Sequence, residues 1–320
     1  TGKVTATVTA ADAVTLVGAL GAAVATDALT LTVNNAAGTA AAATVLNALD
    51  GKTSVKVKVD AVEVSGLYAD LEKVYVTNKA GFANLGDEKV TITGGSVTAD
   101  KVNVIAKATK GEVTATVTAN TADVLVANLK DATATDALGL TVNGASAKAA
   151  DLNTLDGKTS VDVIVDAANV TGNIADLTKL YITNADNFAS LGGETVTISG
   201  TVTAAQADSI ADKTTAAVTA NIAAATAASL NAALSDGADV NAYKLTVNGA
   251  TAAAADLIAL DAKTSVDVEV NATTITGNIA DVTKVLVTDK AHFVNLGDET
   301  VTISGTVTAA QADSIADKTT

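Results

Sequence analysis

Hydrophobic and polar residues alternate along many short stretches of this chain. Residues 161–165, written VDVIV, place valine at every second position. A period of two with one apolar face predicts a half-buried β-strand. In the middle third of the chain, such runs begin near Val113, Leu138, Val161, Leu180 and Val196.

The stretches between these strands are rich in alanine and carry helix signals. In residues 203–213, TAAQADSIADK, Thr203 is a suitable N-cap and Gln206 follows three residues later. This spacing predicts a capping box, in which each side chain bonds to the backbone of the other residue. The alanines and Ile210 fall on one side of the predicted helix, which indicates a short amphipathic helix.

The same pattern occurs three times. GKTSVKVKVDAVEVSG recurs as GKTSVDVIVDAANVTG and AKTSVDVEVNATTITG, at residues 51–66, 157–172 and 262–277. Internal repetition of this kind is typical of repeat architectures. The copies cover residues 1–110, 111–215 and 216–320.

The segment TVTISGTVTAAQADSIADKTT at 195–215 returns unchanged at 300–320. The chain therefore begins and ends near the same phase of its repeat. We expect one continuous rod that is cut from a longer array. Gly157 is a candidate helix C-cap, and because Ala262 takes its place in the third copy, the cap either tolerates alanine or is not left-handed.

Strand and short helix alternate about every 21 residues, about five times in each copy of about 105 residues, which predicts an α/β solenoid. Short parallel strands would build the sheet, and the alanine-rich helices would lie close to it. The alternative is three tandem all-β sandwich domains. The capped alanine-rich segments, the aromatic content of 2% and the lack of a Pro/Gly-rich linker favour the solenoid.

The amino-acid composition argues against several classes of protein function. A hydrophobic content of 48% is too high for a disordered chain. The net charge of −15 and the pI near 4.3 argue against nucleic-acid binding. The most apolar stretch, residues 16–25, is too short for membrane insertion. The absence of cysteine excludes disulfides and thiol chemistry.

No catalytic constellation is visible in the sequence. GKT at 51–53 and 157–159 resembles the end of a phosphate loop, but the first glycine of that motif is missing and the helix precedes the strand. His292 is the only histidine, and the aligned positions hold Gly81 and Asn187. We therefore expect no enzyme activity and no catalytic residue.

Acidic turns offer the one candidate for a cofactor. LGDE at 85–88 and 296–299, and LGGE at 191–194, place carboxylates in equivalent turns. Because Ca²⁺ prefers oxygen ligands, these turns are candidate calcium sites, and the alternative is a solvated acidic turn. The candidate ligands are Asp87, Glu88, Glu194, Asp298 and Glu299.

Two further sets of residues recur at equivalent positions. Phe82, Phe188 and Phe293 are predicted to fill the core beside these turns. Threonines line the outer face of the strands, which is typical of stable sheets. A flat threonine array also occurs in ice-binding proteins, but the unequal lengths of these units and the charged residues among the threonines argue against that function. The outer threonines are Thr114, Thr116, Thr118, Thr195, Thr197, Thr300 and Thr302.

The cysteine-free, acidic copies, such as VTGNIADLTKLYITNADNFASLGGETVTISGTVTAAQADSIADKTT, resemble repeat regions of large bacterial surface proteins. Surface-layer proteins, secreted adhesins and extracellular fibre subunits share this composition. The resemblance implies an extracellular or cell-surface location, a structural or adhesive role and often calcium dependence. It includes no family-defining motif, so it transfers no site residues.

We expect a structural, non-enzymatic segment of a surface fibre, layer or adhesin stalk. Stacking of successive turns would stabilise it, and it would associate with further copies of itself. The alternative is a binding module whose Thr/Asp/Lys-rich sheet face recognises a glycan, a partner protein or, less readily, ice. Neither hypothesis includes nucleic-acid binding or membrane insertion.

Overall fold

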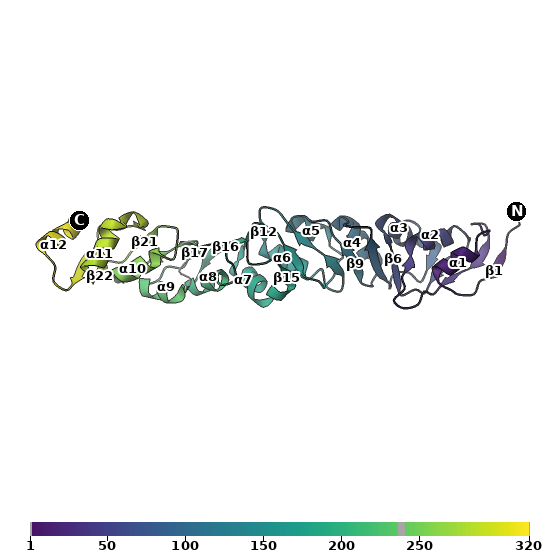
Figure 1. Cartoon of the computed structure of the whole chain (residues 1–320), viewed down its shortest axis with the longest axis horizontal. Coiled ribbons are helices and arrows are strands. Elements are labelled where there is room, and N and C mark those ends of the chain that lie inside the picture. Colours follow the sequence, from purple (N-terminus) through teal and green to yellow (C-terminus); the bar gives the residue numbers. More distant parts are fainter. Residues whose placement is uncertain (1, 236–240, 320) are drawn as a thin grey trace. The chain divides into compact units, whose positions relative to one another are not determined.

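The chain is described by a computed structural model, which covers residues 2–235 and 241–319. Short parallel strands alternate with helices throughout these residues (Figure 1). Every strand pair in the described part of the chain is parallel. The solenoid-like α/β fold class is confirmed, and the sandwich alternative is wrong because a sandwich requires antiparallel sheets.

The first copy contains α-helices of five to ten residues and strands of two to five residues. Its elements are β1 (Thr5–Thr7), α1 (Ala13–Ala19), β2 (Ala28–Thr30), β3 (Thr32–Val33), β4 (Ala41–Ala42), α2 (Ala43–Asp50), β5 (Val57–Val59), β6 (Glu63–Leu67), α3 (Tyr68–Glu72), a π-helix (Lys73–Thr77), a 3-10 helix (Lys79–Gly81), β7 (Phe82–Ala83), β8 (Lys89–Thr93) and α4 (Ala99–Ala108).

The second copy repeats this order, with a longer last strand. Its elements are β9 (Val113–Thr116), α5 (Ala122–Asn128), β10 (Ala137–Gly139), β11 (Thr141–Val142), β12 (Ala147–Lys148), α6 (Ala149–Asp156), β13 (Val163–Val165), β14 (Asn169–Asn173), α7 (Ile174–Thr178), a π-helix (Lys179–Thr183), a 3-10 helix (Ala185–Asn187), β15 (Phe188–Ala189), β16 (Thr195–Val202) and α8 (Ala204–Ala211).

The third copy has the same order again. Its elements are β17 (Val218–Ile222), α9 (Ala227–Ala233), β18 (Ala242–Lys244), β19 (Thr246–Val247), β20 (Thr251–Ala253), α10 (Ala254–Asp261), β21 (Val268–Val270), β22 (Thr274–Asn278), α11 (Ile279–Thr283), a π-helix (Lys284–Thr288), a 3-10 helix (Lys290–His292), β23 (Phe293–Val294), β24 (Thr300–Ser304) and α12 (Ala309–Ala316).

The expected strand at Leu180 is wrong, because Lys179–Thr183 is a π-helix. Leu177, Leu180 and Tyr181 are all buried. This i, i+3, i+4 spacing covers one face of a helix, whereas a strand would bury alternate residues. Among the described residues, each copy contains four α-helices, against the about five strand-and-helix units expected.

The chain divides into two compact units. The first contains residues 1–143, 151–166 and 186–189, and the second contains residues 144–150, 167–185 and 190–320. The sheets of the first unit have strand orders β1-β2, β3-β5-β7, β10-β9-β8-β6-β4 and β11-β13-β15. Those of the second have strand orders β12-β14-β16-β17-β18, β19-β21-β23 and β20-β22-β24.

Alanine at the start of a helix lets that helix lie very close to a strand. A Cβ atom on Gly172 in β14 would lie 2.9 Å from the Cβ of Ala149 in α6. Gly66 and Gly277 face Ala43 and Ala254 in the same way, at 3.0 and 3.1 Å. The glycine–alanine contact therefore sets the separation of strand and helix in all three copies.

The ends of the helices follow the local signals in the sequence. The predicted capping box is present, because Gln206 N donates to Thr203 Oγ1 at 3.3 Å and Thr203 N donates to Gln206 Oε1 at 3.0 Å. Gly51 and Ala262, which follow α2 and α10, have φ angles of −70° and −68°. These caps are right-handed, which explains why alanine replaces glycine there.

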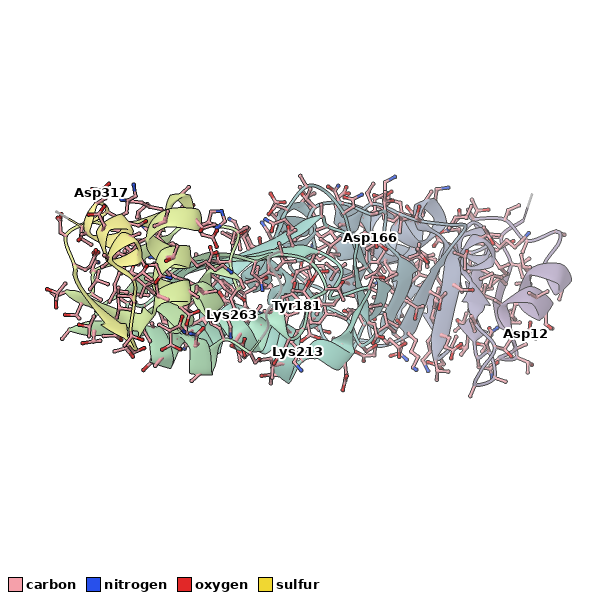
Figure 2. All side chains as sticks on the ribbon, turned by 60° about the vertical axis from the view of Figure 1, so that its left-hand side comes forward. Asp12, Asp166, Tyr181, Lys213, Lys263 and Asp317 are labelled. Carbon is pink, nitrogen blue, oxygen red and sulfur yellow. The ribbon has the colours of Figure 1, made fainter. Side chains whose placement is uncertain are left out.

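The core is built from small aliphatic side chains and a few rings. Figure 2 shows the described side chains along the chain, whose sequence contains 35 acidic and 20 basic residues. Phe82, Phe188 and Phe293 are buried, which confirms their predicted place in the core. No described helix has the length and apolar character that a membrane span requires.

Candidate functional site: the stacking faces between turns

The last turn of the second copy is covered by the first turn of the third copy. β16 pairs with β17 so that Val196 lies opposite Val218. α8 packs against β17 and α9. Val196, Ala207 and Ile210 are completely buried. An apolar stripe on each turn is therefore removed from water by its neighbour, as in other repeat proteins.

The junction between the first and second copies is built in the same way. Val90 in β8 lies opposite Val113 in β9, and both are completely buried. The N–H of Val90 donates to the carbonyl oxygen of Glu112 at 2.8 Å. At the later junction, Val196 N donates to the carbonyl oxygen of Ala217 at 3.0 Å. The sheet thus continues across each copy boundary without a separate interface.

Buried threonines join consecutive turns. Thr53, from the first GKT segment, accepts a hydrogen bond from Leu29 N at 3.0 Å and donates to the Leu29 carbonyl oxygen at 2.7 Å. In the third copy, Thr264 bonds to the N–H and carbonyl oxygen of Tyr243 at 3.0 and 2.8 Å. The GKT segment is therefore a structural turn. Its threonine hydroxyl forms hydrogen bonds with a backbone N–H and a backbone carbonyl oxygen of the preceding turn.

Three of the predicted calcium ligands point into the protein. Glu88 accepts hydrogen bonds from Tyr75 Oη at 3.2 Å and from Gly86 N at 2.8 Å. Glu194 accepts from Tyr181 Oη and from Gly192 N. Burial and the adjacent glutamate raise the pKa of Tyr75 and of Tyr181 well above the ordinary value, so both phenols act as donors.

The third copy keeps the glutamate but lacks the phenol. Glu299 is buried and accepts from Gly297 N at 2.9 Å, while Leu286 occupies the position equivalent to Tyr181. Because the glutamate–glycine bond occurs in all three copies, these carboxylates hold the shape of the acidic turn.

Among residues 2–235 and 241–319, no group of three or more His, Cys, Asp or Glu side chains is placed to hold a metal ion. Asp87 is exposed and lies 3.9 Å from Lys110 Nζ. Asp298 is also exposed, whereas the next residue, Glu299, is buried. Calcium binding at these turns stays a prediction.

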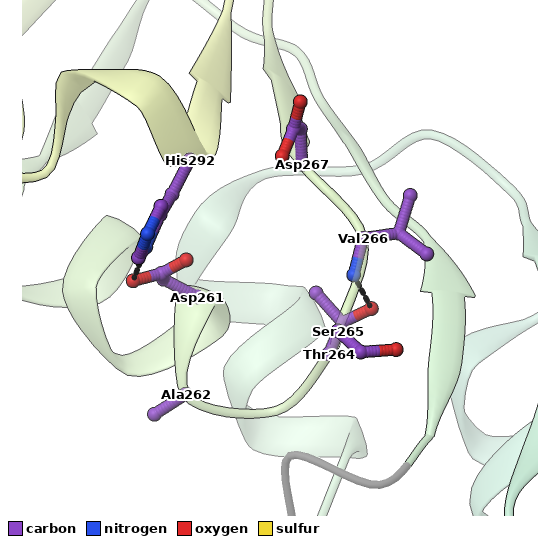
Figure 3. Close-up of a pocket in the computed structure, with 7 residues that line it drawn as sticks. All are labelled: Asp261, Ala262, Thr264, Ser265, Val266, Asp267 and His292. Carbon is purple, nitrogen blue, oxygen red and sulfur yellow. Dashed lines mark hydrogen bonds and ion pairs between the residues drawn. The ribbon is translucent and has the colours of Figure 1, made fainter.

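His292 lines a surface groove of about 360 Å³ in the third copy (Figure 3). Its Nδ1 lies 3.1 Å from Asp261 Oδ2, across the end of α10. This hydrogen bond raises the pKa of His292 above its ordinary value. On the other side of the groove, Val266 N donates to Thr264 Oγ1 at 3.2 Å. The histidine is exposed and precedes the buried Phe293 in the sequence.

The other copies have the same carboxylate without the histidine. Asn187 Nδ2 donates to Asp156 Oδ1 at 2.9 Å, in a groove of about 320 Å³. In the first copy, a Cβ on Gly81 would overlap the Asp50 carboxylate, and burial raises the pKa of Asp50. Every copy thus has an aspartate at this position, whereas the residue beside that aspartate varies. The sequence indicates this aspartate because it recurs two residues before each KTS segment.

The outer threonines form rows that cross successive turns. Thr171 in β14 lies opposite Thr197 in β16, which lies opposite Thr219 in β17. In the third copy, Thr274 and Thr276 lie opposite Thr300 and Thr302. β-branched residues on neighbouring strands stabilise a sheet by packing together.

Comparison of the chain with protein-family models, with curated proteins and with solved structures finds no match.

Proposed function

We propose that this chain is a structural, non-enzymatic repeat segment of an extracellular surface fibre, layer or adhesin stalk. The observation that supports it most strongly is the sheet that continues from β8 into β9 and from β16 into β17. Strands pair in parallel across each copy boundary, as they do between turns within one copy. A further copy would therefore extend the sheet through the same kind of strand pairing.

The chemistry of the side chains supports the same role. Thr53, Glu88 and Asp136 are buried and bonded to backbone groups, so their polar atoms stabilise turns. A repeat protein of this design gains stability from contacts between neighbouring turns. Its function would depend on length and number of turns rather than on one reactive group.

A change in copy number tests the proposal. Removal of residues 111–215 joins Lys110 to Ala216 and leaves two copies. Lys110 N and Thr215 N make equivalent hydrogen bonds, to the carbonyl oxygens of Gly86 and Gly192 at 2.6 and 2.9 Å, so the new junction is in register. Dyes on Gly2→Cys and Asp317→Cys can be placed selectively because the native chain has no cysteine.

We expect higher energy-transfer efficiency between the dyes in the folded two-copy chain than in the three-copy chain. Circular dichroism of both chains is the control for folding. Equal transfer efficiencies in two folded chains would show that copy number does not set the separation of the ends. That result would contradict a role as a spacer.

The paired threonine rows favour a second candidate, a binding module that uses the outer sheet face. Regularly spaced hydroxyls next to Asp and Lys side chains suit a glycan, with a partner protein or ice as other ligands. A glycan array probed with the labelled full chain distinguishes the two proposals. Saturable binding that is lost in Thr197→Val would favour the binding module over the spacer.

A further inference from the structure

We infer that Asn271 is a site of N-linked glycosylation. Residues 271–273 read Asn-Ala-Thr, which matches the acceptor pattern Asn-x-Ser/Thr with a residue other than proline in the middle. The ligand is an oligosaccharide that becomes covalently attached to the side-chain amide. The inference rests on the proposed extracellular location, because this modification is made on exported chains.

The structure places this pattern at the surface, in the loop between two strands. Asn271 follows β21, and Thr273 precedes β22. Both side chains are exposed, whereas Ala272 between them is only 4% exposed. The acceptor amide and the threonine therefore lie at the surface, while the residue between them is packed in the core.

The hydrogen bonds of the Asn271 side chain are compatible with an attached sugar. Asn295 Nδ2 donates to Asn271 Oδ1 at 3.0 Å, and Asn271 Nδ2 donates to Glu269 Oε1 at 3.4 Å. An N-linked sugar replaces one of the two hydrogens on Nδ2 and leaves Oδ1 as an acceptor. The shorter of the two bonds is therefore retained in the modified side chain.

The other copies show that the fold does not require the amide nitrogen. Asp60 and Asp166 occupy the position of Asn271, and this position is exposed in all three copies. In the first copy, Asn84 Nδ2 donates to Asp60 Oδ1 at 2.7 Å, as Asn295 Nδ2 donates to Asn271 Oδ1. A carboxylate oxygen fills the same structural role, so Nδ2 of Asn271 is available for modification.

The third copy differs from the others at both residues that the pattern requires. Val62 and Ala168 occupy the position of Thr273. In the first copy, Asp60 and Val62 line an open surface groove of about 290 Å³, so this loop has solvent space beside it. The two differences together create an acceptor pattern at an open surface position.

A second Asn-x-Thr pattern is present at residues 169–171. Asn169 is half-buried in β14, which pairs with β12 on one side and with β16 on the other. Its Oδ1 accepts a hydrogen bond from Thr195 Oγ1 at 3.0 Å. Because an attached glycan is bulky and occurs in surface loops, the inference is confined to Asn271.

The transfer involves no oxidation or reduction. The donor is an oligosaccharide joined through diphosphate to a polyprenyl lipid, and an oligosaccharyltransferase catalyses the step. A bond forms between Asn271 Nδ2 and the anomeric carbon of the first sugar, while the bond from that carbon to the diphosphate oxygen breaks. The lipid diphosphate leaves, and Nδ2 loses one proton.

The hydroxyl of Thr273 indicates when this transfer takes place. In the folded chain it donates to the carbonyl oxygen of Ala250 at 2.9 Å. Because the pattern requires a hydroxyl at this position, we expect transfer before the loop closes against the preceding turn. The test therefore uses a chain that is modified during export.

The full chain, exported by a host that has an oligosaccharyltransferase, tests the inference. Cleavage after lysine isolates the site, because Lys263 and Lys284 bound the peptide 264–284. Mass spectrometry of this peptide, before and after amidase treatment, shows whether Asn271 is occupied. We expect a glycan on most molecules of the peptide. An exported native chain with Asn271 unoccupied would overturn the inference.

Two substitutions at Thr273 form a matched pair. Thr273→Ser keeps the pattern and should keep the glycan, whereas Thr273→Ala removes the pattern and should abolish it. Ala168 occupies this position in the second copy, so the alanine variant should fold. A glycan that persists on Asn271 in the alanine variant would contradict the assignment.

Transfer of the pattern to the first copy tests the role of the loop. Asp60→Asn together with Val62→Thr places Asn-Ala-Thr at the equivalent position, where Ala61 is buried as Ala272 is. We expect a second glycan, on the peptide 59–73 that follows Lys58. Occupied Asn271 without a glycan on this peptide would show that the loop does not favour the modification.

The structure also predicts that the glycan leaves the fold intact. Amidase removes the glycan and converts Asn271 to aspartate, the residue of the other two copies. The melting temperature should therefore be nearly the same before and after this treatment. A glycosylated chain that melts well below the treated chain would contradict a loop suited to carry a glycan.

These tests are separate from the test of the proposed function. A chain without a glycan can still show the dependence of energy transfer on copy number. A glycosylated chain can still lack that dependence. Failure of the glycosylation inference is therefore distinguishable from failure of the structural role.

Discussion

The hydroxyl of Thr159 is bonded to both backbone groups of Leu138, one turn earlier. Thr159 Oγ1 accepts from Leu138 N at 3.0 Å and donates to the Leu138 carbonyl oxygen at 2.8 Å. Both residues are buried, so water does not replace these bonds. One side chain thereby joins two turns of the first unit.

Thr159→Val keeps the shape of this side chain and removes its hydroxyl. We expect a loss of about 1–3 kcal/mol in the free energy of unfolding, because two buried backbone groups lose a partner. Urea unfolding measures the change. Thr159→Ser keeps the hydroxyl and should cost less, and a valine variant as stable as the native chain would contradict the role of this hydrogen-bond pair.

Gly172→Ala should destabilise the second unit by overpacking. Its Cβ would lie 2.9 Å from Ala149 Cβ and 3.3 Å from Leu177 Cγ. We expect a cost of about 1–3 kcal/mol in thermal or urea unfolding. Gly193→Ala is the control, since no atom lies within 4 Å of the new Cβ. Similar costs for both variants would show that the close approach to α6 does not matter.

The same substitution in the two identical segments should have unequal effects. Val196→Ala creates a cavity under β17 and should cost about 2 kcal/mol in unfolding free energy. Val301→Ala should cost less than half as much, because Val301 is only half-buried. Urea unfolding of the two variants and the native chain measures both costs. Equal costs would indicate that the covering turn adds nothing to the burial of Val196.

The hydrogen bond between His292 and Asp261 should be visible in a pH titration. It raises the pKa of His292, so its contribution to stability is complete below the ordinary pKa of about 6.5. That contribution is lost as the pH rises through the raised pKa. As the chain has one histidine, proton NMR of its ring follows the titration directly.

In the native chain we expect a midpoint above the ordinary histidine value. Asp261→Asn should lower the midpoint toward that value, because the carboxylate is removed. Asp313→Asn is the control and should leave the midpoint unchanged, because the carboxylates that raise the pKa of His292 are those of Asp261, Asp289 and Asp267. The pairing is disproved by a native midpoint at or below the ordinary value.

Most of the elements could be predicted from local patterns. The alternation around Val163 and Val165 predicts the buried face of β13, and Thr203 with Gln206 predicts the start of α8. These predictions succeed because strand pleat and helix capping depend on residues only a few positions apart. Leu180 misled the prediction, because β-branched and aromatic neighbours suggest a strand while their burial follows a helical face.

The candidate site was less predictable. The acidic turns suggested exposed carboxylates, but Glu88 and Glu194 point inward to glycine N–H groups and tyrosines. The tyrosine and glutamate of each pair lie 13 residues apart, and a local pattern does not indicate such a contact. The threonine of each GKT segment likewise bonds to a residue one turn away.

The two identical segments separate what sequence and tertiary structure each decide. In both, the sequence alone determined the Thr–Gln capping box and the eight-residue helix, through hydrogen bonds within the segment. The strand is Thr195–Val202 in the first segment and Thr300–Ser304 in the second, because its hydrogen bonds are made to neighbouring strands. Only the tertiary structure decided that Val196 is buried while Val301 is half-exposed, because a covering turn packs on the first segment. The burial of a side chain depends on the turn that packs against it. The sequence of the segment alone does not specify which turn that is.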